Sequence, residues 1–189
     1  MATVTPSEVI DGVAVVTPDV HGDERGCFVE TYRRSWFPGG REMIQANRAD
    51  RRANSIVGLH YHLHQADYWY IPVGRARVVL HDLRTGSPTD RATLVIDVGA
   101  DLNGGPHDHS GIYIPPGIAH GFSALTDMTI TYLVDGYYNA ADELGVAWDD
   151  PEIAADWGVS EPVVSDRDQA NPKRSEITAA LQPHRALRT

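Results

Sequence analysis

The residues best suited to chemistry lie in one short segment, GLHYHLHQADYWYIPVG, at positions 58–74. It carries histidines at alternate positions, His60, His62 and His64, followed by Asp67. Imidazole exchanges protons near neutral pH and also binds transition metals, and a carboxylate supports either chemistry. Alternate side chains of a strand share one face, so the three histidines are expected to point the same way, with His64 near the strand end. The segment therefore predicts an acid–base site or a metal site.

The rest of the sequence predicts a β-rich scaffold to position these groups. Short apolar or alternating runs recur about every ten to fifteen residues, with Gly, Pro, Asp or Asn between them, which indicates a sandwich or barrel. The runs lie at 13–16, 26–32, 43–47, 56–62, 68–73, 76–83, 92–98, 111–116 and 128–134. Helical patterns are confined to 150–157 and to 175–182, where Ser175 is the expected N-cap.

Composition limits the possible partners and location. A chain of 189 residues is expected to form one domain. Its net charge of −10 argues against a nucleic-acid or anionic-membrane partner, because both need a basic face. The single cysteine, Cys27, excludes an internal disulfide and favours a reducing compartment, and no apolar run is long enough to span a membrane. We therefore expect a cytoplasmic protein.

Seven segments in a fixed order carry a specific resemblance. They are GDERGCFVETY (22–32), IQAN (44–47), GLHY (58–61), DLRTGSPT (82–89), IYIPPGIAHGF (112–122), YLVDGYYNAADELGVAWDDP (132–151) and SDRDQANP (165–172). Over residues 20–172 the chain resembles the dTDP-4-dehydrorhamnose 3,5-epimerases. The resemblance implies an all-β double-stranded β-helix, the cupin jelly roll, with short C-terminal helices. It implies one cupin domain at 1–189, with a core at about 20–172 and a tail at 173–189.

The resemblance also implies an isomerase of deoxysugar biosynthesis that epimerises a dTDP-4-keto-6-deoxyhexose at C3, C5 or both. Such a reaction needs a base to remove the proton beside the ketone and an acid to return one on the other face. By resemblance His60 is the base, Asp168 orients it and Tyr132 is the proton donor. The pairing is chemically reasonable, because a carboxylate on one imidazole nitrogen raises the basicity of the other.

Substrate binding is implied in the same way, with no cofactor. Matching positions on the nucleotide side are Arg25, Phe28 and Glu30, which the family supplies from the partner subunit of a homodimer. Tyr138 offers a second face for stacking the base. The positions expected to line the sugar–diphosphate cleft are Gln45, Asn47, Asp67 and His120.

Four positions depart from the family pattern. Val57 replaces an arginine that contacts the diphosphate, and Asp67 replaces a lysine near the enolate oxygen. Val78 stands where the family usually has an aspartate, and His62 where it usually has glutamine. Loss of the lysine removes a stabiliser of the enolate, which costs on the order of several kcal/mol if it is uncompensated. We therefore expect a modified mechanism or another source of positive charge.

A divalent metal ion is one such source. Two strand histidines, a carboxylate and a later histidine form the ligand set of metal-binding cupins, and His60, His62, Asp67 and His120 match it. The PxGxxH spacing that ends at His120 is present, but Ala124 replaces the asparagine that usually follows. The alternative function is thus a metal-dependent isomerase, lyase or oxygenase, and a non-catalytic sugar-binding cupin is a third. We favour the epimerase without a required metal.

Overall fold

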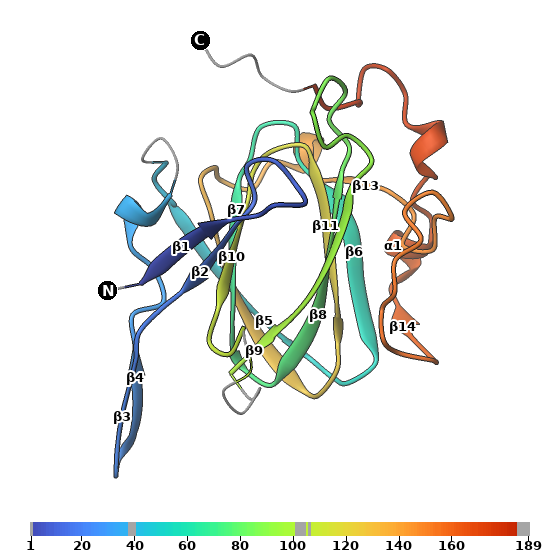
Figure 1. Ribbon diagram of the computed structural model, residues 1–189. Coiled ribbons are helices and arrows are strands. Elements are labelled where there is room, and N and C mark those ends of the chain that lie inside the picture. Colours follow the sequence, from blue (N-terminus) through green and yellow to red (C-terminus); the bar gives the residue numbers. More distant parts are fainter. Residues whose placement is uncertain (1, 38–40, 101–104, 106, 185–189) are drawn as a thin grey trace.

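The computed structural model describes residues 2–37, 41–100, 105 and 107–184, and two β-sheets face each other in it (Figure 1). The first sheet has the order β1 (Thr3–Pro6), β2 (Ala14–Thr17), β10 (Gly111–Ile114), β7 (Asp67–Val73), β12 (Met128–Val134) and β5 (Gln45–Arg51). The second has the order β13 (Leu144–Gly145), β6 (Ser55–Tyr61), β11 (Ile118–Ala124), β8 (Arg75–Asp82) and β9 (Thr93–Gly99). The pairs along both orders are antiparallel, and β14 (Val163–Val164) runs parallel to β6.

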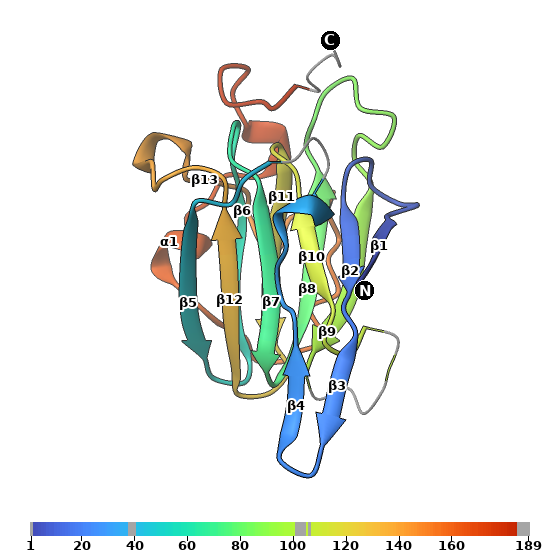
Figure 2. The same cartoon turned by 90° about the vertical axis from the view of Figure 1, so that its left-hand side faces the viewer.

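The remaining elements lie outside the two sheets. A hairpin of β3 (Val20–Asp23) and β4 (Gly26–Val29) projects from the barrel, beyond the lower edge of the first sheet (Figure 2). The described helices are short: α1 (Asp166–Gln169) and 3-10 turns at Arg34–Trp36, Ala140–Asp142 and Arg174–Glu176. Among the described residues, no helix is long and apolar enough to cross a membrane.

Three apolar clusters hold these layers together. The first fills the space between the sheets and includes Trp69, Ile71, Val78, Leu80, Ile112, Ile114, Phe122 and Ile130. The second lies where the C-terminal segments cover the second sheet, around Leu59, Tyr61 and Trp157. The third joins the N-terminal segment to the first sheet, around Phe37 and Tyr68. Each fully buried aliphatic or aromatic side chain contributes about 1.5–3 kcal/mol through its removal from water.

The jelly roll predicted from the sequence is confirmed, with corrections in detail. The predicted runs do not include strands β1, β3, β11, β13 and β14. Within the PPGIAHGF segment, His120 lies in the middle of β11. All seven residues of β11 are buried between β6 and β8, so the strand shows no polar alternation in the sequence.

The predicted C-terminal helices are also corrected. Residues 151–153 form a turn and 154–157 are irregular, and the helical part of the C-terminal segment is the 3-10 turn Arg174–Glu176. Its N-cap position is Lys173, so Ser175 is not a cap. The Arg174 N–H and guanidinium are held by Asp150 and Asp90, so tertiary contacts fix this segment in place of helix propensity.

One irregularity in β6 sets the direction of its histidine. His60 pairs with His120, and Val57 pairs with Phe122. Between these two pairs β6 advances by three residues and β11 by only two. This is a β-bulge, and it reverses the in–out alternation of the strand. Val57 therefore faces the space between the sheets, Leu59 packs outside, and His60 points inward again. Gly58 forms the bulge with a φ of +105°, a conformation that favours glycine.

Gly58→Ala is expected to destabilise the fold and to reduce activity with it. A Cβ at this position would lie 2.7 Å from the His120 carbonyl oxygen and 2.9 Å from Gly121 Cα. Strained φ and overpacking together predict a loss of roughly 3–5 kcal/mol in the free energy of unfolding, measured by chemical denaturation. The control is Gly86→Ala, whose φ is +76° but whose Cβ meets nothing within 4 Å, and it should cost about 1–2 kcal/mol. Equal losses in the two variants would contradict this role for the bulge.

Candidate active site

A cavity of about 330 Å³ opens between the two sheets. Its polar wall carries five of the residues singled out by the sequence: His60, His62, Asp67, His120 and Tyr132. Its apolar wall is the end of the inter-sheet core, with Val57, Trp69, Phe122 and Ile130. Partial exclusion of water strengthens every electrostatic interaction inside such a site.

His60 is held by a buried carboxylate. Its Nε2 lies 2.7 Å from Asp168 Oδ1, and the second oxygen of Asp168 accepts the Gly58 N–H at 3.3 Å. Asp168 lies in α1, where the Ser165 hydroxyl caps the helix by accepting the Asp168 N–H. Burial alone would raise the pKa of Asp168, but its contacts with His60, Gly58 and Ser165 outweigh burial and lower it. Asp168 is therefore ionised at neutral pH, so Nε2 of His60 carries a hydrogen and Nδ1 is the basic nitrogen.

Tyr132 reaches the same cavity from the opposite sheet. It lies on β12, opposite Asn47 on β5, and is partly buried. Burial raises the pKa of its phenol, and the charges of Asp67 and Glu143 raise it further, against a smaller lowering by Arg51. Tyr132 therefore keeps its proton at neutral pH and can donate it.

The second polar group in the cavity is formed by His62, Asp67 and His120. The Nε2 atoms of His62 and His120 lie 3.9 and 4.0 Å from the Asp67 oxygens. Burial lowers the pKa of His120 to about 4, so its ring is neutral near pH 7. Asp67 accepts hydrogen bonds from Gln65 Nε2 at 3.0 Å and Trp69 Nε1 at 3.1 Å.

His62 lies just beyond the end of β6, and a loop contact fixes its position. The Asp142 carboxylate accepts hydrogen bonds from the N–H groups of Leu63 and His64. The backbone carbonyl oxygen of Asp142 lies 2.7 Å from His62 Nδ1. His64 is exposed in this loop, as expected from its place near the strand end. Of the four predicted metal ligands, His62, Asp67 and His120 come together, whereas the Nε2 of His60 is turned to Asp168.

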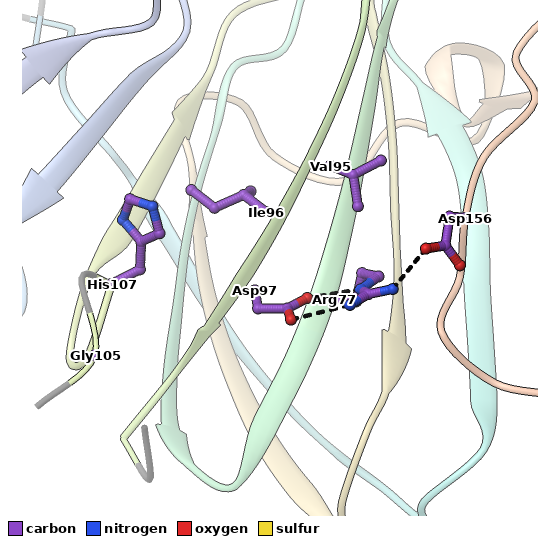
Figure 3. Close-up of a pocket in the computed structure, with 7 residues that line it drawn as sticks. All are labelled: Arg77, Val95, Ile96, Asp97, Gly105, His107 and Asp156. Atoms are coloured by element: carbon purple, nitrogen blue, oxygen red, sulfur yellow. Dashed lines mark hydrogen bonds and ion pairs between the residues drawn. The ribbon is translucent and has the colours of Figure 1, made fainter. Parts of the chain in front are cut away.

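A second hollow of about 530 Å³ lies over β8 and β9 (Figure 3). Its cation, Arg77, lies between Asp97 and Asp156, at 2.7 and 2.9 Å. These charges are paired with one another, whereas the barrel cavity holds a histidine on a buried carboxylate and a tyrosine opposite it. We therefore place the active site in the barrel.

Comparison with known proteins identifies the family. Residues 7–176 match the dTDP-4-dehydrorhamnose 3,5-epimerase family. The chain belongs to this family. It is 32% identical to dTDP-4-dehydrorhamnose 3,5-epimerase of Shigella flexneri, over 84% of this chain and 89% of that one. It is 36% identical to dTDP-4-dehydrorhamnose 3-epimerase of Streptomyces niveus, over 85% and 78% of the two chains.

A solved structure agrees with the assignment. The dTDP-6-deoxy-D-glucose-3,5-epimerase of Legionella pneumophila, in complex with dTDP-4-keto-L-rhamnose, superposes with a TM-score of 0.89. The superposition covers 99% of this chain and 100% of that one, at 27% identity. The predictions of the family, the fold and the isomerase class are thereby confirmed.

The residues expected to bind substrate in this epimerase family fall into two groups. Gln45 and Asn47 share the inner face of β5 and are joined at 3.1 Å, and Gln45 accepts the Tyr138 N–H at 3.3 Å. Tyr138 lines the cavity but is 69% exposed. By contrast, the N-terminal residues lie on or beside the projecting hairpin: Arg25 pairs with Asp23, Glu30 pairs with Arg33, and Phe28 is 69% exposed. These residues do not line the barrel cavity of their own chain.

Three charged residues in the cavity are missed by sequence reasoning: Arg51, Glu143 and Arg167. Arg51 follows Gln45 and Asn47 at even spacing along β5, so strand alternation would have placed it on their face. Glu143 lies in an irregular segment and Arg167 in the four-residue helix α1, with 3.7 Å between the Arg167 guanidinium and the Glu143 carboxylate. Such segments give no periodic signal.

Proposed function

We propose that this chain, as a single cupin domain, is a nucleotide-sugar epimerase of deoxysugar biosynthesis that acts on a dTDP-4-keto-6-deoxyhexose. The observation that carries the proposal is that His60, held by Asp168, lines one cavity together with Tyr132. Family members named as 3,5-epimerase and as 3-epimerase both resemble the chain, and both chemistries act beside the same ketone. The proposal therefore covers one or both carbons.

The arrangement of base and acid suits inversion of a carbon. His60 lies on β6 of the second sheet, and Tyr132 lies on β12 of the first, so they approach a bound sugar from opposite walls. His60 removes the proton beside the ketone, the electron pair moves to the ketone oxygen, and Tyr132 protonates the carbon on the other face. Both proton transfers use side chains of the protein.

His60→Asn should abolish exchange of substrate hydrogen with deuterium from solvent. Removal of a general base costs about 10²–10⁴-fold in rate, whereas Asp168→Asn should cost less because the imidazole remains. Exchange is measured by NMR of a dTDP-4-keto-6-deoxyhexose in D₂O, and binding of dTDP should change little. The control is His64→Asn, an exposed histidine of the same segment. Exchange at the wild-type rate in His60→Asn would remove His60 from the reaction.

Tyr132→Phe separates the acid from the base. With His60 intact, deuterium should still enter the substrate, but the product of inversion should fall because the donor on the opposite face is lost. Normal inversion in this variant would assign the acid to another group.

Arg51 is proposed to grip the diphosphate in place of the family's arginine at position 57. Val57 leaves that wall apolar, but Arg51 lines the same cavity and its charge acts on the Tyr132 phenol. Its Nη1 donates to the Asp50 carbonyl oxygen, which leaves the other guanidinium donors for a phosphate.

Arg51→Gln should weaken dTDP binding by roughly 10- to 100-fold, the value of a charged hydrogen bond. Titration calorimetry with dTDP measures the change. Arg48→Gln is the matched control, because Arg48 is on the outward face of the same strand and pairs with Asp50. A similar small effect in both variants would place the diphosphate elsewhere.

The chain is also proposed to act as a homodimer in which the β3–β4 hairpin of one subunit completes the site of the other. Support comes from the separation of Arg25, Phe28 and Glu30 from their own cavity and from the exposure of Phe28. An exposed aromatic on a projecting hairpin is suited to burial against a partner or a base.

Mixing two inactive variants tests this arrangement. His60→Asn removes the base, and the double variant Arg25→Ala/Phe28→Ala removes the hairpin contacts. Mixed dimers should regain activity, because one of their two sites combines an intact base with an intact hairpin. Each variant alone is the control. Failure to regain activity despite subunit exchange, or a stable monomer in sedimentation at micromolar concentration, would contradict the shared site.

A further inference from the structure

Three side chains with possible ligand atoms converge in a buried, polar part of the cavity. They are those of His62, Asp67 and His120, all of them buried. One ligand atom from each lies within 4.8 Å of the others. The two rings are adjacent, with centroids 5.3 Å apart.

In both imidazole rings Nδ1 contacts a backbone carbonyl oxygen and Nε2 is the nitrogen nearer to Asp67. Nδ1 of His62 lies 2.7 Å from the Asp142 carbonyl oxygen, and Nδ1 of His120 lies 2.9 Å from that of Ile118. A carbonyl oxygen only accepts, so each Nδ1 carries a hydrogen, which leaves Nε2, the nitrogen nearer to Asp67 in each ring, as the atom that can offer a lone pair. Histidines that bind metals are commonly fixed in this way by a second contact through the other nitrogen.

Asp67 adds a negative charge that its neighbours do not neutralise. Its two hydrogen bonds come from the neutral groups of Gln65 and Trp69. Within the part of the chain that the structure describes, the side chains at ion-pairing distance from it are the two histidines alone. A buried carboxylate without a cation is costly.

We propose that His62, Asp67 and His120 bind one divalent transition-metal ion. Two imidazole nitrogens and one carboxylate oxygen suit ions such as Zn²⁺, Co²⁺, Ni²⁺, Fe²⁺ or Mn²⁺. Three protein ligands leave coordination positions open, as in catalytic metal sites. His60 stays outside the set because Asp168 holds its Nε2, so the base and the metal site are separate groups in one cavity.

The bound ion would compensate for the negative charge of Asp67, which stands where the family has a lysine. This consequence rests on the proposed epimerase function. The family's lysine is replaced by Asp67, and a divalent ion there returns a positive charge to the wall where an enolate oxygen would form. A metal ion can stabilise such an oxygen as a Lewis acid. This assignment departs from our expectation of a site without a cofactor.

Metal uptake by the full chain, purified without a histidine tag and stripped with a chelator, tests the proposal. Equilibrium dialysis against Zn²⁺ and against Co²⁺ should give one ion per chain, with a rise in melting temperature because the ion binds the folded state. Asp67→Asn and His120→Gln should each weaken binding by roughly 100-fold, on the scale of changes at metal sites. The control is His64→Asn, which changes an exposed histidine two positions after His62 and should bind like the wild type.

The outcomes are separable. Uptake well below one ion per chain in the wild type, or equal uptake by Asp67→Asn and His64→Asn, would overturn the site. Two ligand variants guard against a folding defect in one, and circular dichroism reports their fold. Metal uptake is measured without substrate, so it is independent of the epimerase reaction. If the wild type binds the metal ion but His60→Asn still exchanges deuterium at the wild-type rate, the proposed function alone is contradicted. Full exchange in a protein that takes up no metal would defeat this inference alone.

Discussion

The carboxylate of Asp168 is the contact on which the active site depends. It joins α1 to the bulge of β6 across 108 residues of sequence, through His60 on one oxygen and the Gly58 N–H on the other. One buried carboxylate thereby holds His60, the bulge at Gly58 and the C-terminal segment that covers the second sheet. Burial raises the pKa of this carboxyl, but its contacts with His60, Gly58 and Ser165 lower the pKa below its usual value.

The space between the two sheets of the jelly roll holds both the apolar core and the polar cavity. At one end, side chains such as Ile71 and Leu80 fill that space and stabilise the sheets, and at the other end it is open and polar. Polar groups at the border are satisfied locally, as where Trp69 packs into the core yet donates its indole N–H to Asp67. Core packing thus holds the cavity wall rigid, which preorganised acid–base chemistry requires.

The family resemblance points to His60, Asp168 and Tyr132, which the structure brings close together and whose catalytic roles stay predictions, and sequence reasoning finds the strands with marked apolar runs. It misses β11, since a strand buried on both faces has no alternation to detect. It also does not predict the bulge at Gly58, because the reversal of the in–out alternation of β6 depends on how β6 pairs with β11. The helix expected at 175–182 fails because contacts of Arg174 with Asp90 and Asp150 override local propensity.

Charge in the cavity is redistributed relative to the family pattern. Position 57 has lost a cation while Arg51 faces the same space from β5, and position 67 has gained an anion beside two imidazole lone pairs. Arg51 on β5 and Asp67 on β7 both belong to the first sheet and line the same cavity. A phosphate and an enolate oxygen each need a positive neighbour, but neither requires that it be a particular residue. The scaffold therefore sets the positions at which a positive charge must contact the phosphate and the enolate oxygen. A side chain on a neighbouring strand or a bound ion can each provide that charge.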